Sequence, residues 1–108
     1  MTRVLSDLGF HLLLALADGP SHGYAIGKDI EERSAGRLDP TTGALYQALQ
    51  RLVEDGLVMP VAGPKSVDAR RKYFALTAAG RRAAAAEAER LDALVRLARK
   101  RKLYPQRA

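Results

Sequence analysis

One stretch of the chain, residues 39–56, carries polar side chains of the kinds that bind nucleic acids. Its apolar residues recur at three- and four-residue spacing, which predicts a helix with one buried stripe. The opposite face bears hydroxyl, amide and guanidinium groups instead of the usual mixture of Glu and Lys. Such groups hydrogen-bond to phosphates and to base edges. The expected DNA contacts of this predicted recognition helix are Thr41, Thr42, Tyr46, Gln47, Gln50 and Arg51.

Within this set the side-chain chemistry divides the roles. Gln47 and Gln50 are assigned to base edges, because an amide can pair bidentately with adenine. The hydroxyls and the guanidinium are assigned to phosphates or to the groove walls. An amphipathic helix commonly buries one face and leaves the other in water, so this helix by itself does not decide the function.

Positive charge gathers a short way beyond this helix. Residues 57–61 and 70–76 have the composition of strands, and residues 62–68 between them form a turn, which predicts a hairpin. A basic hairpin after a recognition helix is a wing, which lies along a phosphate backbone or enters a minor groove. A solvated hairpin without a partner is the alternative. The expected contacts are Lys65, Arg70, Arg71 and Lys72.

Three further features position these residues. Asp39 is expected to cap the recognition helix, with Pro40 at its first position and Gly56 ending it in a left-handed conformation. Residues 23–34, after a start at Ser21, predict a helix that a short loop joins to it, as a helix-turn-helix requires. Residues 8–17, capped by Ser6 or Asp7, predict an earlier helix that is apolar on more than one side.

A last helix is predicted over residues 78–102, with Thr77 as its cap. Its apolar stripe would be exposed on a single subunit, so we expect a two-fold homodimer. The basic end, residues 99–102 and Arg107, is interpreted as a soluble end rather than a second phosphate contact. The expected dimer contacts are Leu8, Leu12, Leu91, Leu94, Val95 and Ala98.

The composition of the chain limits which classes of protein and partner are possible. A chain of 108 residues with 47% hydrophobic residues fits one small domain, and its net charge of +6 favours a polyanionic partner. No cysteine is present, and His11 and His22 lack the short spacing of a helical zinc site. The sequence predicts no metal, no cofactor and no enzyme activity. No secretion signal or membrane segment is apparent, so a cytoplasmic location is expected.

Taken together, four segments resemble the PadR family of winged-helix transcription regulators. They lie within residues 9–82 in the order and spacing of that family. The segments are LLAL at 13–16, GPSHGYAI at 19–26, GALYQALQRL at 43–52 with GLV at 56–58, and RRKYFALTAAGR at 70–81.

The resemblance implies a mainly α fold with a β-hairpin wing, divided into a winged helix-turn-helix at 1–76 and a dimerisation helix with a basic tail at 77–108. It also implies a repressor that a small hydrophobic effector releases from DNA, in the shorter of the family's two forms. Tyr24 resembles a family phosphate contact, with a core position as the alternative. The sequence departs from the family pattern at Ala44 and Phe74, where many members carry Thr and Tyr, and the last helix has no Trp for an aromatic drug sandwich.

Three functions therefore compete. A homodimeric regulator bound to an inverted-repeat operator in double-stranded DNA accounts for both the polar helix face and the basic hairpin. A ligand-sensing dimer with weak or lost DNA binding needs neither feature. A winged helix acting as a piece of a larger assembly is the third, since fold alone does not fix function.

Overall fold

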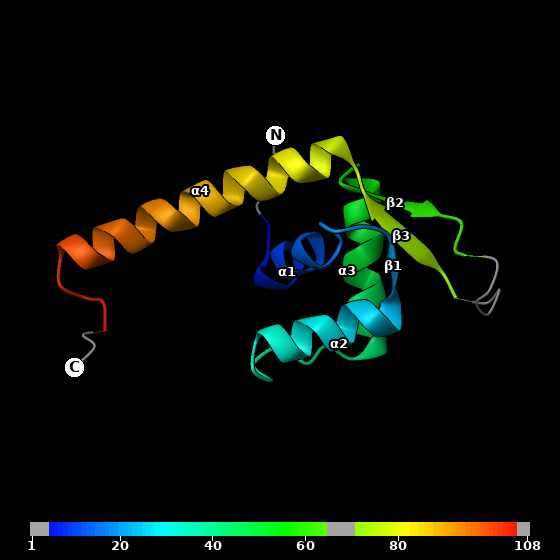
Figure 1. The fold of residues 1–108 in the computed structure, drawn as a ribbon, viewed down its shortest axis with the longest axis horizontal. Coiled ribbons are helices and arrows are strands. Elements are labelled where there is room, and N and C mark those ends of the chain that lie inside the picture. Colours follow the sequence, from blue (N-terminus) through cyan, green and yellow to red (C-terminus); the bar gives the residue numbers. More distant parts are fainter. Residues whose placement is uncertain (1–4, 65–70, 106–108) are drawn as a thin grey trace.

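Helices and a small antiparallel sheet alternate along the chain in the computed structural model, which describes residues 5–64 and 71–105. Figure 1 shows the first helices gathered into one body, with a hairpin on one side and the last helix leaving on the other. The elements are α1 (Asp7–Ala15), β1 (Ser21–His22), α2 (Gly23–Arg33), α3 (Thr42–Glu54), β2 (Val58–Val61), β3 (Tyr73–Leu76) and α4 (Ala78–Lys100).

The hydrophobic core lies where α1, α2 and α3 meet the hairpin. Burying a leucine or isoleucine side chain in this core stabilises the fold by roughly 1.5–3 kcal/mol. In the first turns of α4, Ala83 and Ala84 pack against this core from outside. The buried residues are Leu12, Leu13, Leu16, Ile26, Ile30, Leu45, Leu49, Leu52, Val58 and Phe74.

This core corrects one expectation about the dimer. Leu12 has none of its surface exposed, because α1 turns it inward against α2 and α3. A partner subunit cannot reach a side chain in that position, so its assignment to a dimer contact is wrong. Leu8 is only partly buried and packs at the edge of the core.

The sheet has a strand that the sequence did not predict. β1, β3 and β2 lie side by side in that order, with Ser21 opposite Phe74 and Val58 opposite Leu76. Ser21 was expected to begin a helix, but it lies in β1, and α2 begins at Gly23. The two predicted strands are confirmed, but each is shorter than expected because residues 57 and 71–72 lie outside the ladder.

Caps fix the ends of the helices. Ser6 caps α1 as predicted, since its Oγ accepts a hydrogen bond from the Gly9 N–H at 2.9 Å. The cap of α3 is Thr41, whose Oγ1 accepts from the Ala44 N–H at 3.1 Å. The expectation that Asp39 caps this helix is therefore wrong by two residues, and Pro40 precedes the helix. Gly56 leaves α3 with a φ of +76°, as predicted.

A single threonine joins the end of α3 to the start of α4. Thr77 Oγ1 accepts from the Gly80 N–H at 2.9 Å, which confirms the predicted cap, and donates to the Gly56 carbonyl oxygen at 2.7 Å. One turn later the Arg81 Nη2 donates to the Ala17 carbonyl oxygen at 2.8 Å, at the end of α1. These contacts fix the direction in which α4 leaves the body.

Replacing Thr77 with alanine is expected to lower the free energy of unfolding by about 1–2 kcal/mol, because the helix loses its cap and the Gly56 carbonyl loses a donor. Thr77→Ser keeps the hydroxyl and should lose much less. Urea denaturation followed by circular dichroism measures both. Equal losses in the two variants would mean that the hydroxyl contributes nothing.

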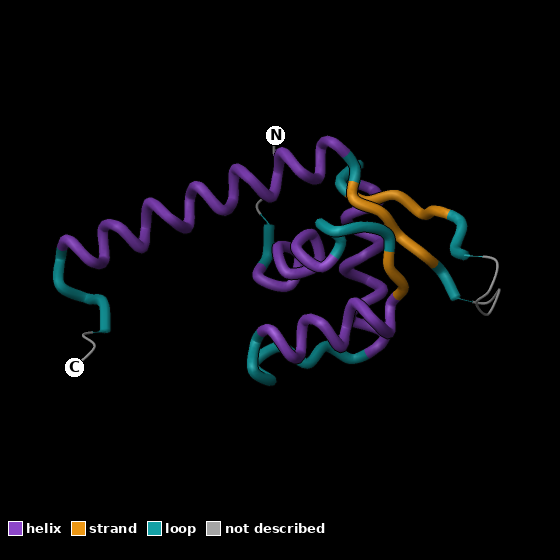
Figure 2. Tube along the Cα trace, viewed as in Figure 1, coloured by secondary structure: helices purple, strands orange, loops and turns teal. Residues whose placement is uncertain are grey.

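Beyond its first turns, α4 extends away from the rest of the molecule (Figure 2). Leu94, Val95 and Leu97 are each at least 40% exposed on this part of the helix. The helix ends at Lys100, two residues before the predicted end. Within the residues that the structure describes, no helix is long and apolar enough to cross a membrane.

Candidate nucleic-acid interface

The predicted recognition helix presents its polar face to solvent. On α3 the inward residues Leu45, Leu49 and Leu52 are buried, as the spacing predicted. The residues assigned to DNA are all exposed, including both glutamines, so none is enclosed by the core. The exposed set is Thr41, Thr42, Tyr46, Gln47, Gln50 and Arg51.

These side chains do not form one uniform face but two rows. Successive residues of an α-helix are rotated by about 100°, so Gln50 follows Tyr46 on one flank and Arg51 follows Gln47 on the other. The line along α3 that faces furthest into solvent, its outermost line, runs between Gln47 and Gln50. A helix inserted into a groove along that line would place one row against each wall.

Tyr46 occupies the flank nearer the hairpin. Its ring centroid lies 6.4 Å from that of Phe74 in β3. On its other side it covers Gly23, where a Cβ atom would approach the Tyr46 Cζ to 2.7 Å. A glycine at this position therefore lets the tyrosine ring lie over the start of α2, which ties the helix-turn-helix to the hairpin.

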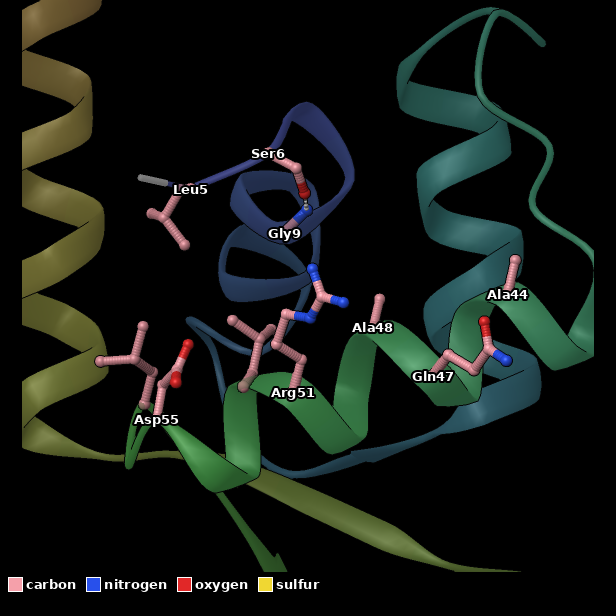
Figure 3. Close-up of a pocket in the computed structure, with 10 residues that line it drawn as sticks. Leu5, Ser6, Gly9, Ala44, Gln47, Ala48, Arg51 and Asp55 are labelled. Carbon is pink, nitrogen blue, oxygen red and sulfur yellow. Dashed lines mark hydrogen bonds between the residues drawn. The ribbon is translucent and has the colours of Figure 1, made fainter. Parts of the chain in front are cut away.

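Gln47 and Arg51 occupy the opposite flank and border a hollow of about 300 Å³. In Figure 3, Arg51 points from α3 toward the start of α1, and Leu5 lies across the hollow beside α4. Sequence reasoning missed this hollow, since its lining comes from two segments far apart in the sequence, residues 5–9 and 44–57. The lining residues are Leu5, Ser6, Gly9, Ala44, Gln47, Ala48, Arg51, Leu52, Asp55 and Leu57.

Beside the start of β3, the structure brings Tyr24 and Arg71 together. Both border a second hollow, of about 460 Å³, at the start of α2. Tyr24 is 72% exposed, so the alternative of a core position is wrong. Lys72 is also exposed. The predicted contacts Lys65 and Arg70 lie outside the described residues, as does Arg107.

His22 is part of this same surface. It caps α2, because its Nδ1 accepts from the Ala25 N–H at 3.3 Å. Its Nε2 lies 3.2 Å from the Arg71 Nη1. Partial burial and, to a smaller extent, the positive charge of Arg71 lower the pKa of His22 below its ordinary value of 6.5.

Arg33 joins the other end of α2 to α1. Its Nε contacts the Asp29 carboxylate at 2.9 Å, and its Nη2 donates to the His11 carbonyl oxygen at 3.0 Å. The His11 Nδ1 lies 3.1 Å from the Arg33 Nη1, so this histidine takes part in the same contact between α1 and α2. Across the described ranges, 5–64 and 71–105, no three acidic, histidine or cysteine side chains cluster as a metal site would require.

A helix-turn-helix whose second helix is exposed, followed by a β-hairpin, defines a winged helix-turn-helix. The family model described as "Transcriptional regulator PadR-like family" matches residues 12–86 of the chain. The protein therefore belongs to the PadR-like family of transcriptional regulators, and the family resemblance predicted from sequence is confirmed.

Solved structures support the same fold. A PadR family transcription regulator from Clostridium difficile superposes with a TM-score of 0.75 at 20% identity, over 88% of this chain and 97% of that one. Bacillus subtilis PadR in complex with operator DNA gives a TM-score of 0.61 at 21% identity, over 71% of this chain and 44% of that one.

One curated relative is much closer in sequence. It is an uncharacterized 37.1 kDa protein in transposon TN4556 of Streptomyces fradiae, 47% identical over 76 residues. Those residues are 70% of this chain, but the chain spans only about a fifth of the length of that relative, 20%.

Proposed function

We propose that the protein is a sequence-specific DNA-binding regulator that acts as a homodimer. The observation that carries this proposal is the exposure of the polar face of α3, with Gln47 and Gln50 on either side of its outermost line. The segment just before β3 adds Arg71 and Lys72 on the same molecule. The Bacillus subtilis relative bound to operator DNA supports the same use of the fold.

In this proposal α3 enters the major groove and the hairpin contacts flanking phosphates. Two subunits related by a two-fold axis place their α3 helices about 34 Å apart, in successive major grooves on one face of the duplex. The operator is then an inverted repeat. Residues 77–108 serve as the dimerisation helix and tail, while residues 1–76 bind DNA.

We further propose that regulation is repression, relieved by a small hydrophobic effector. The hollow beside α3 supports this part, because Leu5, Leu52 and Leu57 supply an apolar wall while Gln47 and Arg51 come from the DNA-facing flank. A ligand held there would contact two of the residues assigned to DNA. Binding of ligand and of operator would then oppose each other.

Selection of bound fragments from random duplex DNA with the purified protein tests the proposed function. A consensus with two-fold symmetry is the expected result, and its centre-to-centre spacing gives the separation of the two α3 helices. Recovery of no shared motif, even at low salt, would contradict sequence-specific binding and favour the alternatives of a sensor or an assembly module.

Replacing Gln50 with alanine should weaken binding to the selected duplex by about 5- to 150-fold for each half-site, because each subunit loses one bidentate base contact worth about 1–3 kcal/mol. Binding to unrelated DNA at low salt should change little, because phosphate contacts supply that affinity. Fluorescence anisotropy measures both.

Gln106→Ala makes the same chemical change in the carboxy-terminal tail and serves as the matched control. Gln47→Ala tests the other row of α3. If Gln50→Ala and Gln47→Ala both bind the selected duplex as tightly as Gln106→Ala does, α3 does not read the base sequence.

A further inference from the structure

The imidazole ring of His22 faces a hydrogen-bond donor on each side. The Ala25 backbone N–H points to Nδ1 at 3.3 Å, as the first bond of the α2 cap. The guanidinium of Arg71 points to Nε2 at 3.2 Å. The ring of Tyr73 packs edge-on against it, with the ring centroids 5.2 Å apart, so the imidazole is held between α2 and the hairpin.

These two contacts compete for a single hydrogen-bond acceptor, because a neutral imidazole ring has only one. A neutral imidazole has one nitrogen that accepts and one that carries a hydrogen, whereas a guanidinium and a backbone amide can only donate. One tautomer of His22 therefore caps α2, and the other accepts from Arg71. A protonated ring can do neither, and it would place a second positive charge beside Arg71.

Other charged groups surround the ring from the neighbouring elements. On α2, Asp29 is held by Arg33 at 2.9 Å. Across Gly23, Tyr46 of α3 covers the start of the same helix. Tyr73 and Arg71 face the ring from the hairpin. The remaining ionisable groups that line the hollow with His22 and Arg71 are Tyr24, Lys28 and Glu32.

We propose that His22 and Arg71 form a proton-linked phosphate contact, in which Arg71 leaves His22 for a DNA phosphate and His22 then takes up a proton. In the free protein the tautomer whose Nε2 accepts holds the guanidinium beside the start of β3. A phosphate that pairs with Arg71 neutralises its charge and adds a negative group near the ring. The protonated Nε2–H then becomes a second donor to the same phosphate.

This contact rests on the proposed function, since it requires DNA beside the start of β3. It adds a dependence on pH that the DNA-binding fold alone does not supply. The affinity should rise as the pH falls between the pKa of His22 in the complex, which a phosphate raises, and its lowered pKa in the free protein. One linked proton per subunit limits the slope to about tenfold per pH unit for each subunit.

The experiment measures affinity for one duplex at constant ionic strength from about pH 5.5 to about pH 8, the range in which histidine titrates. Calorimetric titration in buffers of different ionisation enthalpy gives the protons taken up on binding. The wild-type protein should bind several-fold more tightly at the acidic end and take up protons near neutral pH.

His22→Asn keeps a side chain that caps helices well but does not titrate, so its affinity should show a much flatter dependence on pH. His11→Gln removes the only other histidine and should keep the wild-type dependence. Arg71→Gln should reduce proton uptake, because without the guanidinium the free ring already binds protons more readily.

A second measurement does not depend on these variants. The ring signals of His22 in the wild-type protein, assigned by their persistence in His11→Gln, give its pKa by nuclear magnetic resonance with and without DNA. A higher pKa in the complex is expected. An unchanged pKa, or a wild-type pH dependence retained by His22→Asn, overturns the proposal while DNA binding itself stands. If the protein binds no DNA at any pH, the proposed function fails and this contact falls with it.

Discussion

Replacing Gly80 with alanine is expected to destabilise the protein by about 3 kcal/mol, although alanine normally strengthens a helix. A Cβ atom at this position would overlap the carbonyl oxygen of Leu57 and lie 2.7 Å from Leu76 Cδ1. The first of these obstacles is backbone, which cannot rotate away as a flexible side chain can. Urea denaturation followed by circular dichroism gives the loss in the free energy of unfolding.

Gly43→Ala is the matched control, because Gly43 also lies within a helix and a Cβ atom there would meet nothing within 4 Å. This variant should be neutral or more stable by up to about 1 kcal/mol, from the lower entropy of its unfolded chain. If the two glycine variants have the same stability, the close approach of α4 to Leu57 is not a constraint on the fold.

Gly80 matters for function because of where α4 begins. Thr77 bonds the end of α3 to the first turn of α4, and Arg81 bonds that turn to the end of α1. Because Gly80 lets the helix touch the backbone of Leu57, between α3 and β2, the direction of α4 is fixed relative to the proposed recognition helix. In a dimer joined through α4, this junction would set the separation of the two DNA-reading faces.

The local pattern of the sequence was enough to predict the helices and the hairpin. The repeat of Leu45, Leu49 and Leu52 defines α3 by itself, and Thr77 and Gly56 are end signals that act within a few residues. Two potential caps, Asp39 and Thr41, lie within three residues of each other. Both have good capping chemistry, so only the path of the loop decided between them.

Features that depend on contacts across the chain could not be predicted in this way. β1 has only two residues, Ser21 and His22, and it exists because β3 offers a free edge. Leu12 and Leu8 both follow the apolar pattern of α1, but the packing of α2 and α3 decides which one is buried. The contact of Arg71 with His22 joins residues 49 positions apart, with no local signal.

The largest effect on DNA binding is expected from Leu94→Asp. Leu94 is 51% exposed on the projecting part of α4, beside Val95 at 40%. In the proposed homodimer a partner helix covers both, so a carboxylate at this position would lose its water without gaining a counter-charge. The variant should be a monomer, and its affinity for an inverted repeat should fall by about 10²- to 10⁴-fold, because the two half-sites are no longer bound together.

Ala93→Asp adds the same charge one residue earlier, where the helix turns the side chain away from the stripe of Leu91, Leu94 and Val95. It should remain dimeric and bind the inverted repeat almost as the wild type does. Analytical ultracentrifugation gives the mass of each variant, and fluorescence anisotropy gives its affinity. A dimeric Leu94→Asp with unchanged affinity would contradict dimerisation through this stripe. A monomeric wild type at micromolar concentration would also contradict it, and a half-site would then be the whole operator.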